Sequence, residues 1–577
     1  MNLTLFRLLL SALVLLAYPP GWAADTKPNV LFIAVDDLND WIGCLGGHPQ
    51  TITPNFDRLA ASGVLFTNAH TAAAACNPSR TAVMTGISPH RSGLYANEQK
   101  MRQILPDEPI LPQHFRNHGY HASGSGKMLH YFIDAQSWDE YFPDKATENP
   151  LPETYYPEDR PVSLPRGGAW QYVETDWGAM PVSDEEFGGD WAVSQWVGAQ
   201  LAKKHEKPFF LACGIYRPHE PWFVPEKYFE PFPLEEVQLP PGYKEGDLDD
   251  LPAAGVKAGR NRYFPHILEH DQWKQGVQGY LASIHFADAM LGRVLDALES
   301  GPNAGNTIVV LWSDHGWHLG EKEHWQKFTA WRACTRVPLM IRVPRGTAPG
   351  LREGTVAGSV CDRPVDLLSL VPTLTELSGI PAKENADGQS LVPLLRDPEA
   401  EWDHVALTYL HHTGSFGMST DDWRYIRYHD GGEELYHIRK DPYEWDNLAA
   451  EPEHAAKLQE LRERAPEKFA PKVSPDPEQL PRLSFHPAGK GKDPPASAPD
   501  GAGFSIALFN RSGDAVEVFW ISPSGVEKSY GILAPGKMRE QPTRPGAVWH
   551  FRKPDGGDPL GHVVVGDRRS RVLIPKR

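Results

Sequence analysis

A continuous apolar run that ends in two carboxylates constrains the fold of this chain more than any other feature. Residues 30–35 read Val-Leu-Phe-Ile-Ala-Val and are followed at once by Asp36 and Asp37. A second run, 307–312, is followed by Ser313-Asp314-His315-Gly316. Continuous runs of strand-forming residues are typical of parallel strands that are buried on both faces. We therefore expect a parallel sheet whose carboxyl edge carries both acidic pairs.

Helical patterns alternate with these runs. Thr53-Pro54 has the cap and the first-turn proline of a helix start. Residues 209–213 read as another buried strand, and the apolar residues between Leu281 and Leu298 follow one helical face. This alternation predicts an α/β fold with a mostly parallel sheet sandwiched by helices.

The chain has 577 residues, which is too many for one ordinary core. The main α/β domain is expected over 24–395. Alternating patterns between 422 and 438, followed by a helix, predict a small antiparallel C-terminal subdomain over 396–470. Residues 471–503 are dense in Pro, Ala and Gly and predict a linker. Short strand patterns separated by turns predict an appended all-β sandwich over 504–577.

The first residues have the pattern of a targeting segment. Arg7 precedes an apolar run from Leu8 to Ala17, and small residues follow up to Ala24. The run is short for a membrane span. We interpret 1–23 as a signal peptide, so the mature protein is expected to be secreted or periplasmic. An uncleaved anchor is the alternative.

Charge and cysteine content narrow the class of function. The net charge of -17 argues against a nucleic-acid partner, because phosphates need a basic surplus. It leaves room for a local basic pocket that binds an anionic substrate. The chain has five cysteines, so at least one thiol lacks an internal partner, and none are spaced as Cys-x-x-Cys.

Asp36, Asp37, Asp314 and His315 are candidate metal ligands. Three carboxylates and one imidazole at one sheet edge suit a hard divalent cation, and Ca²⁺ fits the predominance of oxygen donors. Because His is an unusual ligand for Ca²⁺, Mg²⁺ and Mn²⁺ stay open on these residues alone. An isolated Asp-Asp pair also fits a helix cap or a solvated turn, a reading that two equivalent strand ends weaken.

The pentapeptide Cys76-Asn77-Pro78-Ser79-Arg80 lies where a helix is expected to begin. A helix N-terminus stabilises an anion, and Arg80 is one turn from Cys76 and can reach the same side. Both are therefore candidate catalytic residues. The alternatives are a small buried thiol and a surface salt bridge.

Four further basic residues are candidates for binding an anionic group or for moving a proton. They are Lys127, His130, His219 and Lys327. A lysine supplies a point charge for an oxyanion, and a histidine can act as acid or base near neutral pH. Pro218 and Pro221 are expected to fix the loop that aims His219. Each of the four alone also fits a solvated loop position.

Taken in order, these blocks resemble type I sulfatases of the alkaline phosphatase superfamily over about residues 27–448. Further matching segments are Pro54-Asn55-Phe56-Asp57-Arg58-Leu59-Ala60, Thr85-Gly86, Pro372-Thr373-Leu374, Gly388-Gln389-Ser390-Leu391 and Glu434-Leu435-Tyr436 through Asn447-Leu448. The spacing Lys127-x-x-His130, the pair Asp314-His315 and the following Gly-Trp-x-Leu-Gly-Glu are similar to the iduronate-2-sulfatase branch.

The resemblance implies a complete mechanism. Cys76 is converted to formylglycine by a formylglycine-generating enzyme, and the hydrate of this aldehyde attacks sulfur to give a covalent sulfo-enzyme. Residue 76 and the four candidate ligands bind one Ca²⁺ ion. Lys127, Lys327 and His219 hold the sulfate, His219 or Lys327 protonates the leaving oxygen, and His130 takes a proton from the second hydroxyl.

The implied substrate is a sulfated carbohydrate, such as iduronate-2-sulfate or another polysaccharide sulfate. One alternative is a phosphate or phosphonate monoester hydrolase of the same superfamily. A binding protein with a degenerate site is a further alternative, although no expected polar group is missing from the sequence.

The last segment resembles the β-domain of the von Hippel–Lindau tumour suppressor over about 505–575. The resemblance is carried by Phe509-Asn510-Arg511-Ser512, Phe519-Trp520, Leu533-Ala534-Pro535-Gly536 and Val548-Trp549-His550-Phe551-Arg552. In that family a pocket of Tyr, Ser, His and Trp binds hydroxyproline, and the matching positions are Tyr530, Thr543, Ala547 and Trp549. Because Ala547 replaces the His, hydroxyproline binding is not expected to carry over. The module either binds a glycan or protein ligand or uses these aromatic residues only as its core.

Overall fold

A computed structural model describes most of the chain. The described residues are 27–147, 149–156, 163–165, 174–474, 476–489, 493–499, 504–566 and 569–576. The predicted signal peptide, 1–23, lies outside them. None of the helices in the described part combines the length and apolarity that a membrane span requires.

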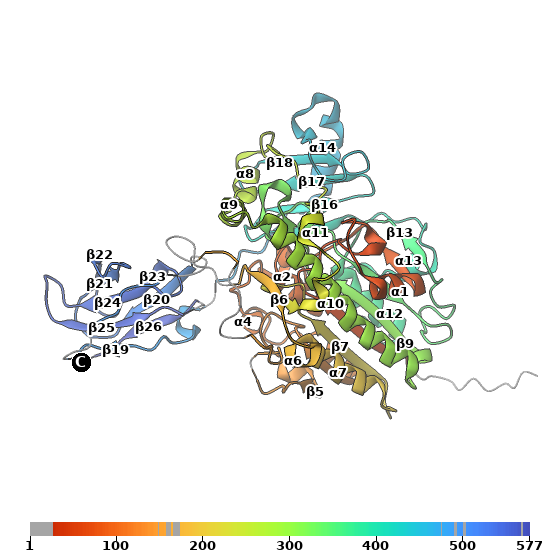
Figure 1. The fold of residues 1–577 in the computed structure, drawn as a ribbon, viewed down its shortest axis with the longest axis horizontal. Coiled ribbons are helices and arrows are strands. Elements are labelled where there is room, and N and C mark those ends of the chain that lie inside the picture. The colour runs from red at the N-terminus through yellow and green to blue at the C-terminus, as the bar shows by residue number, and fades with distance from the viewer. Residues whose placement is uncertain are drawn as a thin grey trace, which may run out of the picture.

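An eight-stranded sheet forms the centre of the main domain (Figure 1). Its strands are ordered β13 (Ser359–Cys361), β2 (Val64–Phe66), β12 (Leu339–Arg342), β9 (Thr307–Ser313), β1 (Asn29–Val35), β7 (Phe209–Ile215), β4 (His121–Gly126) and β5 (Glu140–Phe142). β1 pairs in parallel with both β7 and β9, and only β12 pairs antiparallel with its neighbours. The mostly parallel α/β sheet predicted from the sequence is confirmed.

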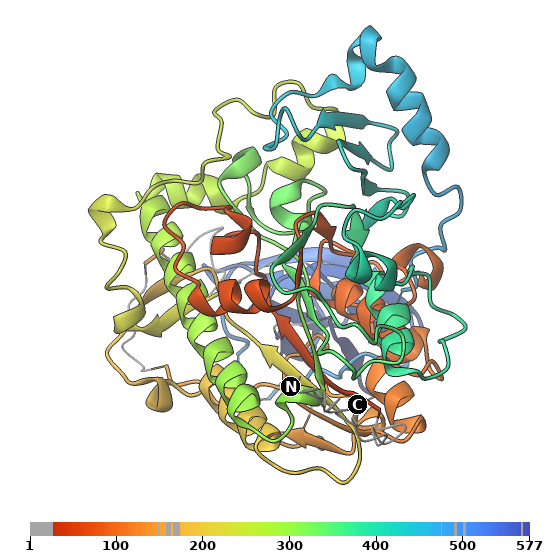
Figure 2. The same ribbon diagram turned by 90° about the vertical axis from the view of Figure 1, so that its right-hand side faces the viewer.

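Helices cover both faces of this sheet, as the continuous apolar runs predict. Leu31 and Ile33 of β1 belong to one hydrophobic core, which includes apolar side chains of α1 (Pro54–Ser62), α7 (Asp190–Leu201) and α10 (Trp273–Ser300). Figure 2 shows α10 as a long helix lying along the sheet. Val30 and Phe32 face the opposite core, with α2 (Cys76–Thr85), α5 (Leu111–Asn117), α12 (Leu370–Ser378) and α13 (Val392–Arg396). Every residue of β1 is buried.

A four-stranded antiparallel sheet follows the main domain. It consists of β15 (Ala406–Tyr409), β16 (Phe416–Ser419), β17 (Trp423–Arg427) and β18 (Glu433–His437), and α14 (Ala455–Arg464) follows it. Tyr409 at the end of β15 accepts a hydrogen bond from the backbone of Ala74. This contact docks the antiparallel sheet beside the segment that leads into α2.

The terminal module contains two further sheets and forms a separate body in Figure 1. One sheet is ordered β19 (His486–Pro487), β25 (Pro559–Val564), β24 (Val548–Arg552), β21 (Val516–Ile521) and β22 (Glu527–Leu533). The other is ordered β23 (Met538–Thr543), β20 (Phe504–Asn510) and β26 (Arg571–Ile574). These sheets, together with the antiparallel sheet before them, match the predicted fold class.

Described residues within the predicted linker over 471–503 contact both the main domain and the terminal module. At its start, Val473 donates a backbone hydrogen bond to Gly93 of the main domain. Later, Leu480 packs against Ala507 and Phe509, and β19 pairs with β25. Prolines remove backbone donors and suppress a strand pattern in the sequence, but the extended chain still packs along the edge of the module.

Candidate active site

Two adjacent strand ends bring the predicted acids together. Asp36 and Asp37 follow β1, and Asp314 and His315 follow β9, its parallel neighbour. The backbone N–H of Asp37 donates to Asp314 Oδ1 at 3.1 Å. All four side chains are fully buried. The carboxyl edge of the sheet therefore holds an acidic cluster, as the strand pattern predicts.

Cys76 is the first residue of α2 and points into this cluster. Its Sγ lies 3.1 Å from Lys327 Nζ and 3.2 Å from His315 Nε2, and 3.9 Å from Asp37 Oδ1. Burial alone would raise the pKa of the thiol, but the charges of Lys127, Lys327 and His315 lower it well below its usual value. The site thus stabilises an anion at position 76.

Arg80 is fully buried one helical turn after Cys76. Its Nη2 donates to Asp36 Oδ1 and its Nε donates to Asp314 Oδ2, both at 2.8 Å, and its Nη1 donates to the carbonyl of Lys127. The guanidinium therefore joins the two strand ends instead of forming the surface salt bridge that the sequence left open. This geometry fits a positioning role for Arg80.

Two lysines supply positive charge on either side of Cys76. Lys127 Nζ donates to Asp36 Oδ2 at 2.5 Å and lies 3.9 Å from the sulfur, and Lys327 Nζ donates to Asp37 Oδ1 at 2.9 Å. Although burial opposes the charged form, the neighbouring carboxylates raise the pKa of both lysines. Both ammonium groups therefore stay charged beside Cys76.

The two candidate histidines have opposite electrostatic surroundings. Burial lowers the pKa of His130, and the neighbouring Cys76 only partly offsets this effect. Burial also disfavours the charged form of His219, but Asp37, 3.7 Å from its Nε2, gives it a raised pKa. His130 is therefore suited to accept a proton and His219 to donate one. The Nδ1 of His219 is bonded to the carbonyl of Glu220 at 2.6 Å, which orients the ring.

The donor set fits a divalent cation. Ligand atoms of Asp37, Cys76, Asp314 and His315 lie within 4.8 Å of one another, and so do those of Asp36, Asp37 and His219. Carboxylate oxygens predominate, as a hard cation requires. Burial alone would lower the pKa of the His315 imidazole, but the charges of Asp314 and Cys76 raise it to about 9. A bound cation would replace the proton on this imidazole.

Tyr131 and Tyr216 belong to the site but were not predicted. Lys127 Nζ lies 4.6 Å and 5.3 Å from their ring centroids, and their hydroxyl oxygens are 3.1 Å apart. The two rings shield the ammonium group from water and make cation–π contacts. Tyr131 follows His130, and Tyr216 precedes Arg217-Pro218. Only this adjacency to predicted residues could have indicated them.

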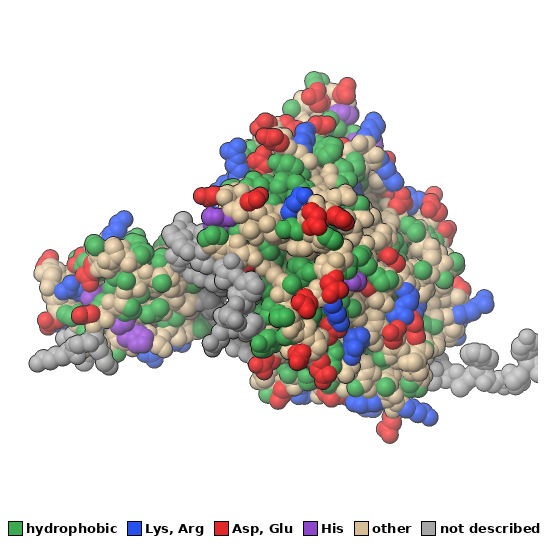
Figure 3. Space-filling view, viewed as in Figure 1, with side chains coloured by type: hydrophobic (Ala, Val, Ile, Leu, Met, Phe, Trp, Pro, Cys, Tyr) green, Lys and Arg blue, Asp and Glu red, His purple; other side chains and the backbone are tan. Residues whose placement is uncertain are grey.

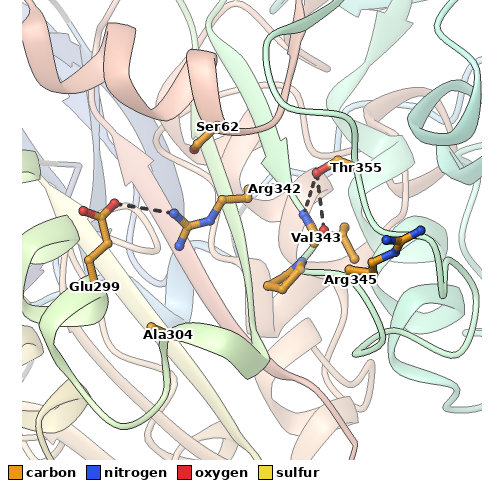
Figure 4. A pocket seen from close by; sticks show the side chains of 8 residues that line it. Ser62, Glu299, Ala304, Arg342, Val343, Arg345 and Thr355 are labelled. Carbon is orange, nitrogen blue, oxygen red and sulfur yellow. Dashed lines mark hydrogen bonds and ion pairs between the residues drawn. The ribbon is translucent and has the colours of Figure 1, made fainter. Parts of the chain in front are cut away.

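A second pocket lies away from this site. Arg342, at the end of β12, lines it and pairs with Glu299 at 3.5 Å, and Thr355 contacts the backbone of Val343 (Figure 4). Cys76 lies beyond the carboxyl end of β9. Arg342 pairs with Val309 near the start of β9, so the pocket lies toward the opposite end of that strand. The polar contacts drawn in Figure 4 join lining residues of this pocket in two pairs, and none of the lining side chains belongs to the acidic cluster.

Substitution of Lys327 tests whether a positive charge beside Cys76 contributes to catalysis more than a positive charge on the protein surface. Lys327→Met is expected to lower kcat/KM about 10²–10³-fold, because the charge that develops on the leaving oxygen loses a buried donor. Lys257→Met, on an exposed position of α8 (Ala253–Gly259), is the matched control. Steady-state kinetics of both variants with one ester substrate measures the two effects. Equal rates for the two variants would contradict the assignment of Lys327.

Comparisons with known proteins agree with this geometry. The family model for sulfatases matches residues 28–380, a model described as N-sulphoglucosamine sulphohydrolase, C-terminal, matches 320–469, and the VHL beta domain model matches 502–565. The structure of the phosphonate monoester hydrolase of Agrobacterium radiobacter superposes with a TM-score of 0.61 at 22% identity, covering 76% of this chain and 94% of that one. This structural likeness supports the α/β fold of the main domain.

Relatives with higher identity narrow the class. A sulfatase of Formosa agariphila is 41% identical over 450 residues, which is 76% of this chain and 86% of the relative. The iduronate 2-sulfatase of Mus musculus is 31% identical over 434 residues, which is 67% of this chain and 75% of the relative. The chain belongs to the sulfatase family, whose members are sulfuric ester hydrolases.

Proposed function

We propose that this protein hydrolyses sulfate esters of carbohydrates and that position 76 is oxidised to formylglycine by a formylglycine-generating enzyme. One observation carries the proposal. Cys76 Sγ lies against Lys327 Nζ and His315 Nε2, at 3.1 and 3.2 Å, at the start of a buried helix beside the acidic cluster. In a member of the sulfatase family, this is the place where a nucleophile would meet a sulfate group.

The residues of the site have different proposed roles in the reaction. A formylglycine at 76 would supply a hydrated aldehyde as nucleophile, and a divalent cation bound by Asp36, Asp37, Asp314, His315 and residue 76 would polarise the sulfate. Lys127 and Lys327 place two charges where the sulfate oxygens would lie. His219 holds a proton for the leaving sugar oxygen, and His130 accepts a proton from the nucleophile side.

The proposed substrate class is a sulfated sugar of the iduronate-2-sulfate kind or another polysaccharide sulfate. It is supported by the mouse iduronate 2-sulfatase and by an ulvan-active sulfatase of Formosa agariphila, which is 26% identical over 469 residues. Export is part of the proposal and is supported by Arg7 and the apolar run that follows it. Sequencing the N-terminus of the mature protein tests export, because a start near residue 24 is expected.

The reaction class is tested by turnover of matched esters. We expect sulfate release from monosulfated sugars to exceed phosphate release from the corresponding phosphate esters. The Lys327→Met variant should lose the sulfatase rate and serves as the control for contaminating enzymes. A preference for phosphate or phosphonate monoesters would instead support the other class of the superfamily, and it would overturn the proposed substrate.

Removal of the cation should abolish turnover without unfolding the protein. Arg80 bonds to both Asp36 and Asp314 and joins the two strand ends, so we expect circular dichroism to change little after chelation. Activity should return on adding Ca²⁺, and titration with Mg²⁺ and Mn²⁺ tests the choice of metal. Full activity after exhaustive chelation, with metal analysis showing no bound ion, would contradict the assignment of the acidic cluster.

A further inference from the structure

A pocket in the terminal module lies where edge strands of its two sheets meet. β22 is the edge of the five-stranded sheet and β23 is an edge of the three-stranded sheet. Residues from both strands and their neighbours line an open pocket with a volume of about 640 Å³. Its lining includes Phe504, Trp520, Tyr530, Thr543, Arg544 and Trp549. The positions Tyr530, Thr543, Ala547 and Trp549, which the sequence resemblance singled out, all contribute to this one pocket.

The aromatic wall of the pocket is fixed by its own contacts. The indole N–H of Trp549 donates to Thr543 Oγ1 at 2.8 Å. The ring of Tyr530 packs edge-to-face on Trp549, with centroids 5.0 Å apart and planes at 81°. Trp549 is 2% exposed, whereas Tyr530 is 42% exposed. The buried ring of Trp549 therefore holds the exposed ring of Tyr530 in place, and Tyr530 lies outside the hydrophobic core of the module.

Cationic side chains surround this aromatic wall. Arg544 lines the pocket, Lys528 Nζ lies 5.6 Å from the centroid of Tyr530, and Arg539 Nη1 donates to the carbonyl of Tyr530 at 3.0 Å. Charge is distributed unevenly along the chain. Residues 504–577 contain twelve Lys and Arg against seven Asp and Glu, although the whole chain has a net charge of -17. Carboxylates are spread over the face of the main domain seen in Figure 3.

We infer that this pocket binds a sulfated polysaccharide and thereby tethers the enzyme to polymeric substrate. Apolar faces of sugar rings pack on exposed aromatic side chains, and Lys528, Arg539 and Arg544 would attract the sulfate groups. The terminal module has a net positive charge although the whole chain has a net negative charge, and this local surplus favours an anionic partner. Ala547 forms an apolar part of the lining at 3% exposure and offers no side-chain hydrogen bond to a hydroxyproline. The inference rests on the proposed function, because it takes its ligand from the same substrate class.

Binding and catalysis can be tested separately with the full chain. Dermatan sulfate is the probe for binding, measured by calorimetry on a Cys76→Ala background so that the ligand is not consumed. Tyr530→Ala combined with Arg544→Gln should weaken binding about tenfold or more, because it removes the exposed ring and one cation. Tyr530→Phe keeps the ring and should bind normally, and Lys553→Gln, beside Asp514 outside the pocket lining, is the charge-matched control.

Kinetics distinguishes failure of this inference from failure of the proposed function. In the active enzyme, the double variant should raise KM for dermatan sulfate about tenfold with kcat unchanged, and it should leave hydrolysis of a monosulfated monosaccharide unaffected. If monosaccharide sulfate is hydrolysed but the double variant binds and turns over the polymer normally, the inference is overturned. Binding of a proline-rich peptide at this pocket in place of the polysaccharide would also overturn it. Failure to hydrolyse either sulfated substrate would reject the proposed function itself.

Discussion

Replacing Cys76 with alanine is expected to abolish sulfate release, with kcat/KM falling by at least about 10⁴-fold. The fold should survive, because Cys76 is a small side chain in a core otherwise held by α2 and the strand ends. The residual rate would come from the charged lysines and the cation alone. Steady-state kinetics and circular dichroism on the same preparation measure the two effects.

Cys76→Ser sharpens this experiment because serine has a hydroxyl but cannot form a hydrated aldehyde. A sulfated serine lacks the second hydroxyl that would expel sulfate, so the variant should turn over at most once. Mass spectrometry should then detect one added sulfo group on the peptide that contains residue 76. Sustained turnover by the alanine variant would show that another residue is the nucleophile.

Arg80→Met is expected to destabilise the protein by about 3–5 kcal/mol, because two buried carboxylates lose their shared partner. In the structure Arg80 bonds to both Asp36 and Asp314 at 2.8 Å, and all three side chains have no exposed surface. Sulfate release should fall together with stability, because the same carboxylates are proposed to bind the cation. Thermal unfolding should show a larger loss after chelation than with Ca²⁺ present, because the ion partly neutralises the unpaired acids.

Arg58→Met is the matched control for this variant. Arg58 also pairs with an aspartate, Asp296, at 2.7 Å, but the two side chains are 36% and 69% exposed. Exposed pairs contribute about 1 kcal/mol or less, so this variant should melt close to the parent. If the two variants melt at the same temperature, Arg80 does not organise the strand ends.

The sheet and its carboxyl edge could be predicted because their signals are local. The run 30–35 is apolar without alternation, and burial of every residue of β1 on two cores explains this pattern. The strand pairing at the end of the predicted linker could not be predicted from local patterns. There β19 pairs with β25, and the two strands are distant in sequence. Prolines in that segment also interrupt the residue pattern by which a short strand is recognised.

The candidate catalytic residues were more predictable than their supporting contacts. Cys76, Lys127 and Lys327 stand in recognisable motifs, and the structure brings all three together. The bridge from Arg80 to Asp314 spans 234 positions, and no residue pattern encodes it. The same holds for the hydroxyl contact between Tyr131 and Tyr216, 85 positions apart. Such pairs depend on how the strands and loops are arranged in space.

Mass spectrometry of the peptide containing residue 76 is the most direct test of the central claim. Protein produced with and without a formylglycine-generating enzyme gives samples that differ in the fraction converted at this position. Sulfate release should rise in proportion to the fraction of formylglycine and be negligible in unconverted protein. Full sulfatase activity in protein whose Cys76 is entirely unmodified would contradict this claim.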